Sequence, residues 1–148
     1  MHLRSATAAD FHAILRLLEQ ATLNGKDLRV DQTHAFHLLC EGHETIACGA
    51  IEDHGSESGL VRSIAVHPSQ RGKGHATQIM RSLEAHARQR GTVKLFLLTE
   101  SATGFFRRLR YEPCDRSLAP ASIQASPQFA GLCPSTAVCM RKDLREDA

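Results

Sequence analysis

A glycine-rich basic turn is the segment of this chain best suited to chemistry. It consists of Arg71, Gly72, Lys73, Gly74, His75 and Ala76. It follows a β-branched run at residues 64–66 and opens an amphipathic helix. The first N–H groups of a helix have no partners within it, and Gly72 and Gly74 leave no side chain between that backbone and a ligand. The segment is therefore predicted to bind a phosphorylated ligand.

The spacing of the glycines narrows the class of ligand. A Walker loop needs four residues between its glycines and a following Gly-Lys-Ser/Thr, and a dinucleotide fingerprint needs a third glycine; both are absent. Arg71-x-x-Gly74-x-Ala76, placed directly after Val66-His67-Pro68, resembles the acyl-CoA pyrophosphate loop of the GNAT family of N-acetyltransferases. The alternative is an ordinary glycine turn that opens a core helix.

The elements around this turn follow from periodicity and capping. Thr7 and Asp10 predict a capping box, followed by a helix with an apolar stripe. Glu84 and Arg88 are expected to pair on the solvent face of the helix after the glycine turn. Strands are predicted over 2–6, 36–40, 45–52, 60–66, 93–98, 111–115 and 137–141, and further helices over 74–90, 103–109 and 121–125.

This order is that of an α/β (α+β) fold with a mixed, mostly antiparallel sheet of six to seven strands flanked by helices. It coincides with the GNAT acyltransferase fold over nearly the whole chain. A length of 148 residues with 42% hydrophobic and 23% charged residues predicts a single GNAT acetyltransferase domain over 1–148.

Composition also limits the partners and the compartment. A net charge of +2 with scattered basic residues argues against a nucleic-acid surface. No apolar run approaches the roughly 20 residues that span a bilayer, and no signal peptide is evident, so no membrane partner is expected. Five cysteines without a repeated spacing indicate free thiols and a cytoplasmic location.

The resemblance implies where acetyl-CoA, the expected co-substrate, would bind. In the GNAT fold the strands at 60–66 and 93–98 splay apart, and the pantetheine arm lies between them. The diphosphate rests on the loop amides. The cofactor-binding residues carried over in this way are Ile64, Ala65, Val66, the six residues of the glycine turn, Thr99 and Phe106.

The implied reaction is direct attack of a primary amine on the acetyl thioester in a ternary complex. It needs a base to take a proton from the ammonium group and an acid to protonate the departing thiolate. The GNAT helix that often supplies a tyrosine to protonate the thiolate here carries Phe106. Tyr111 is the substitute acid, and the alternative is that Tyr111 is a core aromatic.

The usual general base is missing as well. Leu60 stands where many family members have a glutamate. Glu52 and Glu57 could act through water, or both could be solvated turn charges. Ser63 alternates with Ile64 and could face the cleft. An α-amino group has a pKa near about 8 and needs little help, which favours an amino-acid-like acceptor.

Residues 118–136 form an unusually long connection before the last strand. This segment resembles the GNAT branch associated with arsenic-resistance operons and, in turn, short amino-acid N-acetyltransferases. The implied small-molecule acceptor is an amino acid or analogue such as glutamate, phosphinothricin or arsinothricin. Cys133 could contact a trivalent arsenical or be a packed small side chain. The residues expected to bind acid groups of the acceptor are Arg29, Arg62, Ser63, Ser135 and Thr136.

Other functions stay open at this point. A non-catalytic acyl-CoA sensor is conceivable because the usual acid and base are missing, and peptide or protein N-acetylation is a third possibility. His34, His37, Cys40 and His43 recur every third residue, but on a strand that spacing alternates faces, so no metal is predicted. A monomer, or a homodimer through the seventh strand, is expected.

Overall fold

A seven-stranded sheet with helices packed on it forms the framework of the computed structural model, which describes residues 1–147. The strand order is β1-β2-β3-β4-β5-β7-β6. β4 and β5 pair in parallel, whereas β1 with β2, β2 with β3, β5 with β7 and β6 with β7 pair antiparallel. The predicted fold class is confirmed.

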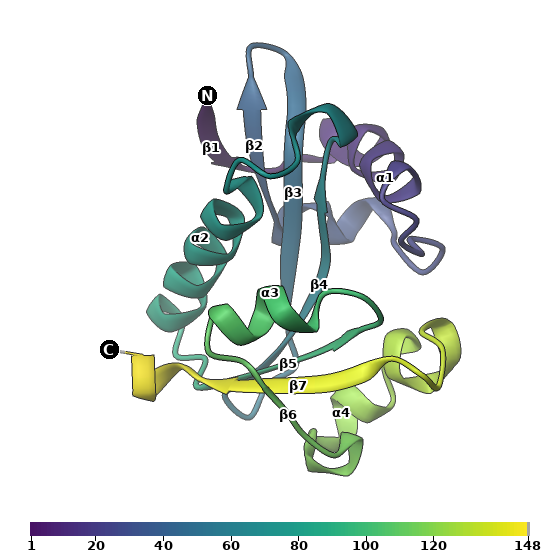
Figure 1. The fold of residues 1–148 in the computed structure, drawn as a ribbon, viewed down its shortest axis with the longest axis vertical. Coiled ribbons are helices and arrows are strands. Elements are labelled where there is room, and N and C mark those ends of the chain that lie inside the picture. Colours follow the sequence, from purple (N-terminus) through teal and green to yellow (C-terminus); the bar gives the residue numbers. More distant parts are fainter. Residues whose placement is uncertain (148) are drawn as a thin grey trace. The chain divides into compact units, whose positions relative to one another are not determined.

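The elements of Figure 1 follow the predicted order. The strands are β1 (His2–Ser5), β2 (Phe36–Glu41), β3 (Glu44–Asp53), β4 (Ser58–Val66), β5 (Lys94–Thr99), β6 (Glu112–Pro113) and β7 (Val138–Asp143). The helices are α1 (Phe11–Gln20), α2 (His75–Gln89), α3 (Thr103–Arg108) and α4 (Ala121–Gln124), and short 3₁₀ and π helices lie between the main elements.

The contacts of the chain divide it into two compact units. The first contains residues 1–51 and 62–86, and the second contains residues 52–61 and those from 87 onward. The glycine turn belongs to the first unit. The long connection between β6 and β7 belongs to the second unit.

In the first unit, α1 and α2 use opposite faces of the strands. Ile14, Leu17 and Leu18 of α1 pack in one cluster with even-numbered residues of β2 and β3, such as Leu38 and Cys48. Successive strand residues point to opposite faces, so the odd-numbered residues face α2. Figure 1 shows the two helices on either side of these strands.

Gly49 of β3 lets α2 approach closely. A Cβ at this position would lie 2.4 Å from Ile64 Cδ1 and 2.8 Å from Ile79 Cγ2. Glu84 of α2 is only 5% exposed, so the expectation that it lies on a solvent face is wrong. The reason is that the buried face of α2 is wider than its apolar stripe.

The core of the second unit is built on β5. Phe96 packs with Leu60, Ala119 and Ile123, and all four side chains are buried. The parallel ladder between β4 and β5 runs from the Ser58–Lys94 pair to the Leu60–Phe96 pair. The connection between β6 and β7 therefore contributes to the hydrophobic core through α4.

The predicted capping box before α1 is present, and an arginine reinforces it. Asp10 Oδ2 accepts the Thr7 backbone N–H at 2.8 Å, and the same carboxylate accepts two hydrogen bonds of 2.8 Å from Arg4. The hydrogen bonds from Arg4, followed by those from Thr7, lower the pKa of Asp10 to about 2.

Asp10→Asn is expected to reduce the free energy of unfolding by about 1 kcal/mol at neutral pH. The folded-state pKa of Asp10 lies below the unfolded value of 3.8, so its contribution is complete above pH 3.8 and is lost as the pH falls towards 2. Urea unfolding as a function of pH should therefore show the free energies of unfolding of wild type and Asp10→Asn converging between pH 3.8 and pH 2. Asp31→Asn, which removes an exposed ion pair with Arg29, should cost less than about 0.5 kcal/mol. A constant difference between wild type and Asp10→Asn down to pH 2 would contradict this account.

Candidate functional site

The glycine turn of the first unit has the backbone that an anion site needs. Residues 71–74 are exposed, and α2 begins directly after them at His75. Gly72 has φ +77° and Gly74 has φ +82°. Apart from the glycine and its two chain neighbours, no atom of the described residues lies within 4 Å of the place a Cβ would take on either. The turn is therefore open and left-handed at both glycines, and the first amides of a 15-residue helix follow it.

His75 adds a buried polar atom at this point. Its side chain is only 8% exposed, and Nδ1 lies 3.3 Å from Gln78 Oε1. Within the described residues, Nε2 has no hydrogen-bond partner. A buried polar atom without a partner is costly, so this nitrogen fits a place where a polar ligand binds.

The basic side chains of the turn hold its shape. Arg71 Nη2 donates to the Gln20 carbonyl at the end of α1 (3.4 Å), and Lys73 Nζ donates to Gln70 Oε1 (3.1 Å). Both side chains therefore tie the turn to its neighbours.

Ser63 interrupts β4 with a left-handed backbone (φ +61°). Such a conformation is costly for a residue other than glycine and is concentrated at functional sites. β4 nevertheless runs without a break from Ser58 to Val66, so Ile64, Ala65 and Val66 continue the same strand. Nothing in the local sequence marks this feature, because serine is an ordinary residue in a strand.

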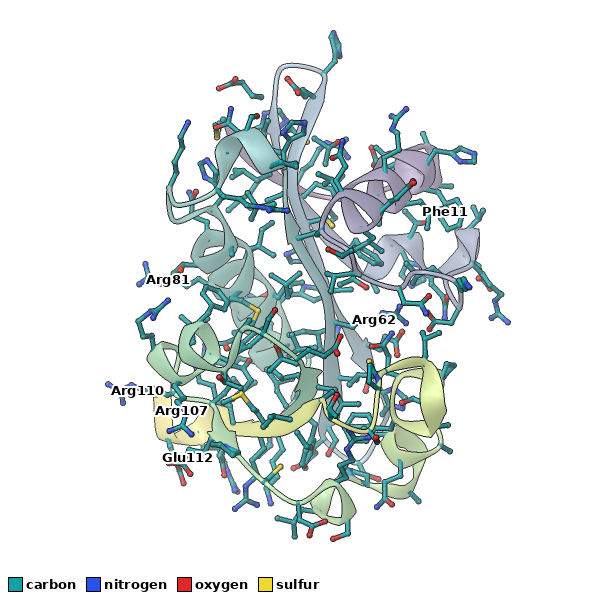
Figure 2. The ribbon with its side chains drawn as sticks, turned by 45° about the vertical axis from the view of Figure 1, so that its right-hand side comes forward. Phe11, Arg62, Arg81, Arg107, Arg110 and Glu112 are labelled. Carbon is teal, nitrogen blue, oxygen red and sulfur yellow. The ribbon has the colours of Figure 1, made fainter. Side chains whose placement is uncertain are left out.

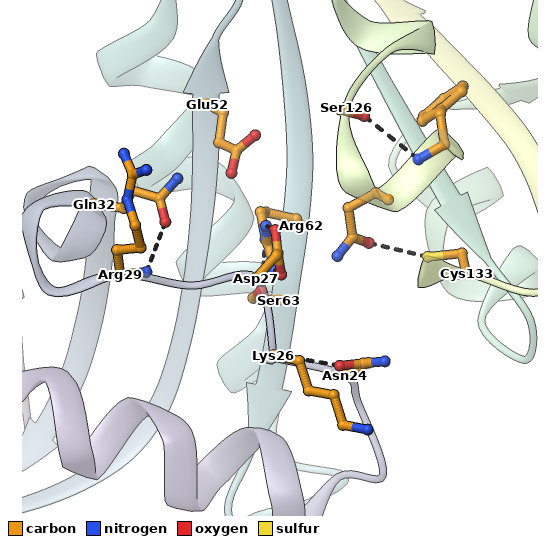
Figure 3. Close-up of polar contacts among 12 residues, drawn as sticks. Asn24, Lys26, Asp27, Arg29, Gln32, Glu52, Arg62, Ser63, Ser126 and Cys133 are labelled. Carbon is orange, nitrogen blue, oxygen red and sulfur yellow. Dashed lines mark hydrogen bonds and ion pairs between the residues drawn. The ribbon is translucent and has the colours of Figure 1, made fainter. Parts of the chain in front are cut away.

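Arg62 is buried and already holds a carboxylate (Figure 3). Its guanidinium donates to both oxygens of Asp27, with Nη2–Oδ1 at 2.7 Å, and Nε donates to Ser63 Oγ at 3.0 Å. Arg29, the other arginine expected to bind an acceptor, is exposed and pairs with Asp31. Arg62 and Ser63 are therefore neighbours joined by a side-chain hydrogen bond, whereas Arg29 lies on the surface of the same unit.

In the second unit, Tyr111 lies beside Phe106. Their ring centroids are 5.6 Å apart in an edge-to-face arrangement, and both residues are buried. Lys142 Nζ lies 5.4 Å from the centroid of the Tyr111 ring. Thr99 Oγ1 accepts the Ala102 N–H (3.1 Å) just before α3, so Thr99 helps to set the start of that helix.

The remaining predicted residues of the second unit lie near its surface. Glu52 is half-buried and its Oε1 lies 3.3 Å from His54 Nε2. Ser135 and Thr136 are exposed. Arg116 holds their segment, because its Nη2 donates to the carbonyls of Pro134, Ser135 and Ala137 at 3.1, 3.3 and 2.8 Å.

A basic hollow of about 680 Å³ also lies in the second unit. Arg107 and Arg110 line it together with Glu112, and Figure 2 labels these three side chains close to one another.

In the described part of the chain, none of the helices combines the length and apolar character that crossing a bilayer requires. Among residues 1–147, no three His, Cys, Asp or Glu side chains form a group that could hold a metal ion.

Solved structures share this fold. The N-acetylglutamate synthase of Neisseria gonorrhoeae, complexed with coenzyme A and N-acetyl-glutamate, superposes with a TM-score of 0.84 at 17% identity, over 97% of this chain and 35% of that chain. A Mycobacterium tuberculosis protein in complex with CoA superposes with a TM-score of 0.81 at 21% identity, over 97% of this chain and 99% of that one.

Sequence comparison points to the same family. The amino-acid acetyltransferase of Edwardsiella ictaluri is 30% identical over 117 residues, which are 76% of this chain and 26% of the relative. That of Pectobacterium carotovorum is 30% identical over 132 residues, 82% and 29% of the two chains. This chain thus spans less than a third of the length of these relatives. The acetyltransferase (GNAT) domain model matches residues 32–113, more than half of the 148 residues, and this range includes the glycine turn before α2. The protein therefore belongs to the GNAT acetyltransferase family.

Proposed function

We propose that the protein is an acetyl-CoA-dependent N-acetyltransferase that acts on the α-amine of an amino acid or a close analogue. The observation that carries this proposal is the open, left-handed glycine turn at the start of α2. Beside it lies the buried Nε2 of His75, which has no hydrogen-bond partner among residues 1–147. The amino-acid acetyltransferases among its relatives support the class of acceptor.

The first unit would hold the co-substrate. The amides of residues 71–76 would bind the diphosphate, and the helix N-terminus would favour its negative charge. The backbone of Ile64, Ala65 and Val66 would bind the pantetheine arm. Acetyl-CoA supplies the activated thioester, and the chain contributes position and orientation, which can lower a barrier by roughly 7–11 kcal/mol.

The two proton transfers would fall to residues of the second unit. Glu52, oriented by His54, would accept the proton of the ammonium group through water. Tyr111 would donate a proton to the departing thiolate. Its ring lies against Phe106, the residue that the family resemblance matches to the usual tyrosine.

Arg29 of the first unit, and separately Ser135 and Thr136 of the second unit, are the residues proposed to bind acid groups of the acceptor. Arg62 would have a different role from the one expected, because Asp27 already occupies its guanidinium. It would act as a positioning residue that anchors the segment leading to Arg29. Ser63 would contribute through its unusual backbone conformation.

The proposal is tested by measuring CoA thiol release from acetyl-CoA with a panel of acceptors. The panel contains glutamate, other amino acids, phosphinothricin, arsinothricin, polyamines and short peptides. Saturable release with an amino acid or analogue is expected. Release only with peptides would replace the proposal by protein N-acetylation, and tight acetyl-CoA binding without release would replace it by an acyl-CoA sensor.

Tyr111→Phe is expected to lower kcat about 10-fold with little change in KM, because the substitution removes a proton donor and keeps the ring. Adding Phe106→Tyr to this variant should restore much of the loss, since it returns a hydroxyl to the usual position. Steady-state kinetics of the single and double variants measure both effects. An unchanged kcat in Tyr111→Phe would show that Tyr111 is only a core aromatic.

A further inference from the structure

Two contacts hold together the two ends of the connection between β6 and β7. Cys114, just after β6, donates its N–H to the Cys139 carbonyl at 2.9 Å, and the two Sγ atoms are 3.4 Å apart. Arg116 makes the second closure through the carbonyl of Ala137. All five cysteines of the chain are free thiols, and these two are already in contact.

The positions of these cysteines suit a covalent bond. Pro113 pairs with Met140 in the antiparallel register, so Cys114 and Cys139 are the next opposed pair. Directly opposed residues in such a ladder have Cα atoms about 4.5–5.5 Å apart, which lies inside the window of about 4.4–6.8 Å that disulfides occupy. To form the bond, the two sulfur atoms must move from 3.4 Å to about 2.05 Å apart.

We propose that Cys114 and Cys139 form a dithiol modification site that a small disulfide, such as oxidised glutathione, converts into an intramolecular disulfide. This inference stands apart from the proposed acetyl transfer. It rests on the sulfur contact, the opposed strand positions and the different exposure of the two thiols.

The exposure of the two thiols sets the order of the steps. Cys114 is partly exposed, whereas Cys139 is 3% exposed. Burial, and next the contact with Cys114, raise the pKa of Cys139 to about 12, so Cys139 is rarely a thiolate. Cys114 therefore reacts first, and Cys139 acts as the resolving thiol.

The reaction balances with one molecule of oxidised glutathione. The Cys114 thiolate attacks one glutathione sulfur, which breaks the glutathione disulfide and releases one glutathione thiolate. Cys139 then loses its proton and attacks the Cys114 sulfur, which releases the second glutathione. The two cysteines lose two electrons in total, and the two glutathione molecules gain them.

The disulfide would close a loop between positions that are 25 apart in the sequence. Closing a loop of this size restricts the unfolded chain, so the midpoint of thermal unfolding is expected to rise by roughly 5–10 °C. The connection that carries Ser135 and Thr136 would be tied covalently at its base.

The test equilibrates the intact protein with a mixture of reduced and oxidised glutathione set to the potential of an oxidising compartment. Free thiols are then alkylated in denaturant, so that the buried Cys40 and Cys48 also react, and the protein is analysed by intact mass and peptide mapping. Two of the five thiols are expected to be protected, with Cys114 linked to Cys139 and the unfolding midpoint raised. Cys133→Ser, which removes a thiol of the same connection, should behave like wild type.

Cys139→Ser separates the steps, since it should stop at a glutathione adduct on Cys114. Cys114→Ser should show neither adduct nor bond at these positions. The proposal is overturned if all five thiols of the wild type are alkylated, if the wild type stops at the glutathione adduct, or if a bond forms to Cys133. The wild-type result decides the matter even where a serine variant folds poorly.

Discussion

Gly74→Glu is expected to weaken acetyl-CoA binding at least about 100-fold while the protein stays folded. The position has φ +82° and open surroundings, so the new side chain meets no steric clash. It would instead strain the turn and place a carboxylate where the diphosphate binds. Losing two hydrogen bonds to a charged group costs about 3–6 kcal/mol, which corresponds to a factor of about 100 or more in Kd. Isothermal titration with acetyl-CoA measures the change.

Gly42→Glu is the matched control. Gly42 lies in the turn between β2 and β3, with φ +60° and nothing within 4 Å of a Cβ, so the same substitution meets the same kind of backbone. Both variants should lose a similar amount of stability, about 1–2 kcal/mol. Only Gly74→Glu should lose affinity. If the two variants bind acetyl-CoA equally well, the glycine turn is not the diphosphate site.

Asp27→Ala is expected to reduce the free energy of unfolding by about 3 kcal/mol. The side chain of Arg62 is only 1% exposed, so removing its carboxylate partner leaves a charged guanidinium in the interior. Because the segment between α1 and β2 loses its anchor, KM for the acceptor should rise as well. Urea unfolding and acceptor kinetics on the same variant give both readouts.

The double variant Asp27→Ala/Arg62→Met distinguishes the contribution of the ion pair to stability from the effect of simply losing contacts. Removing both charges should recover most of the stability, since no buried charge is left without a partner. The coupling energy of the double-mutant cycle should be about 2 kcal/mol or more. A loss below about 1 kcal/mol in Asp27→Ala would show that solvent reaches Arg62.

The sequence predicts the order of elements and the glycine turn before α2 because both depend on local signals. Hydrophobic periodicity marks α1, α2 and the strands, and the spacing of Gly72 and Gly74 marks the turn. The strand expected over 111–115 shrinks to Glu112–Pro113. The reason is local too: proline has no N–H to donate, and β6 lies at the edge of the sheet.

The partner of Arg62 could not be predicted, because Asp27 lies 35 positions away and is met only in the folded chain. A signal was present, however. An arginine inside the apolar run of β4 must find a buried counter-charge or leave the core. The left-handed conformation of Ser63 had no such signal, since the tertiary environment imposes it on an ordinary strand residue.

The central claim is that the chain moves an acetyl group from acetyl-CoA to an α-amine, and identification of the product tests it most directly. The purified protein would be incubated with acetyl-CoA carrying an isotopically labelled acetyl group and with the acceptor that gives the greatest thiol release. Mass spectrometry and NMR would then locate the label. Labelled acetyl is expected on the α-nitrogen of the acceptor with wild type and Gly42→Glu, and much less with Gly74→Glu. Label on another atom, or equal labelling by Gly74→Glu, would contradict it.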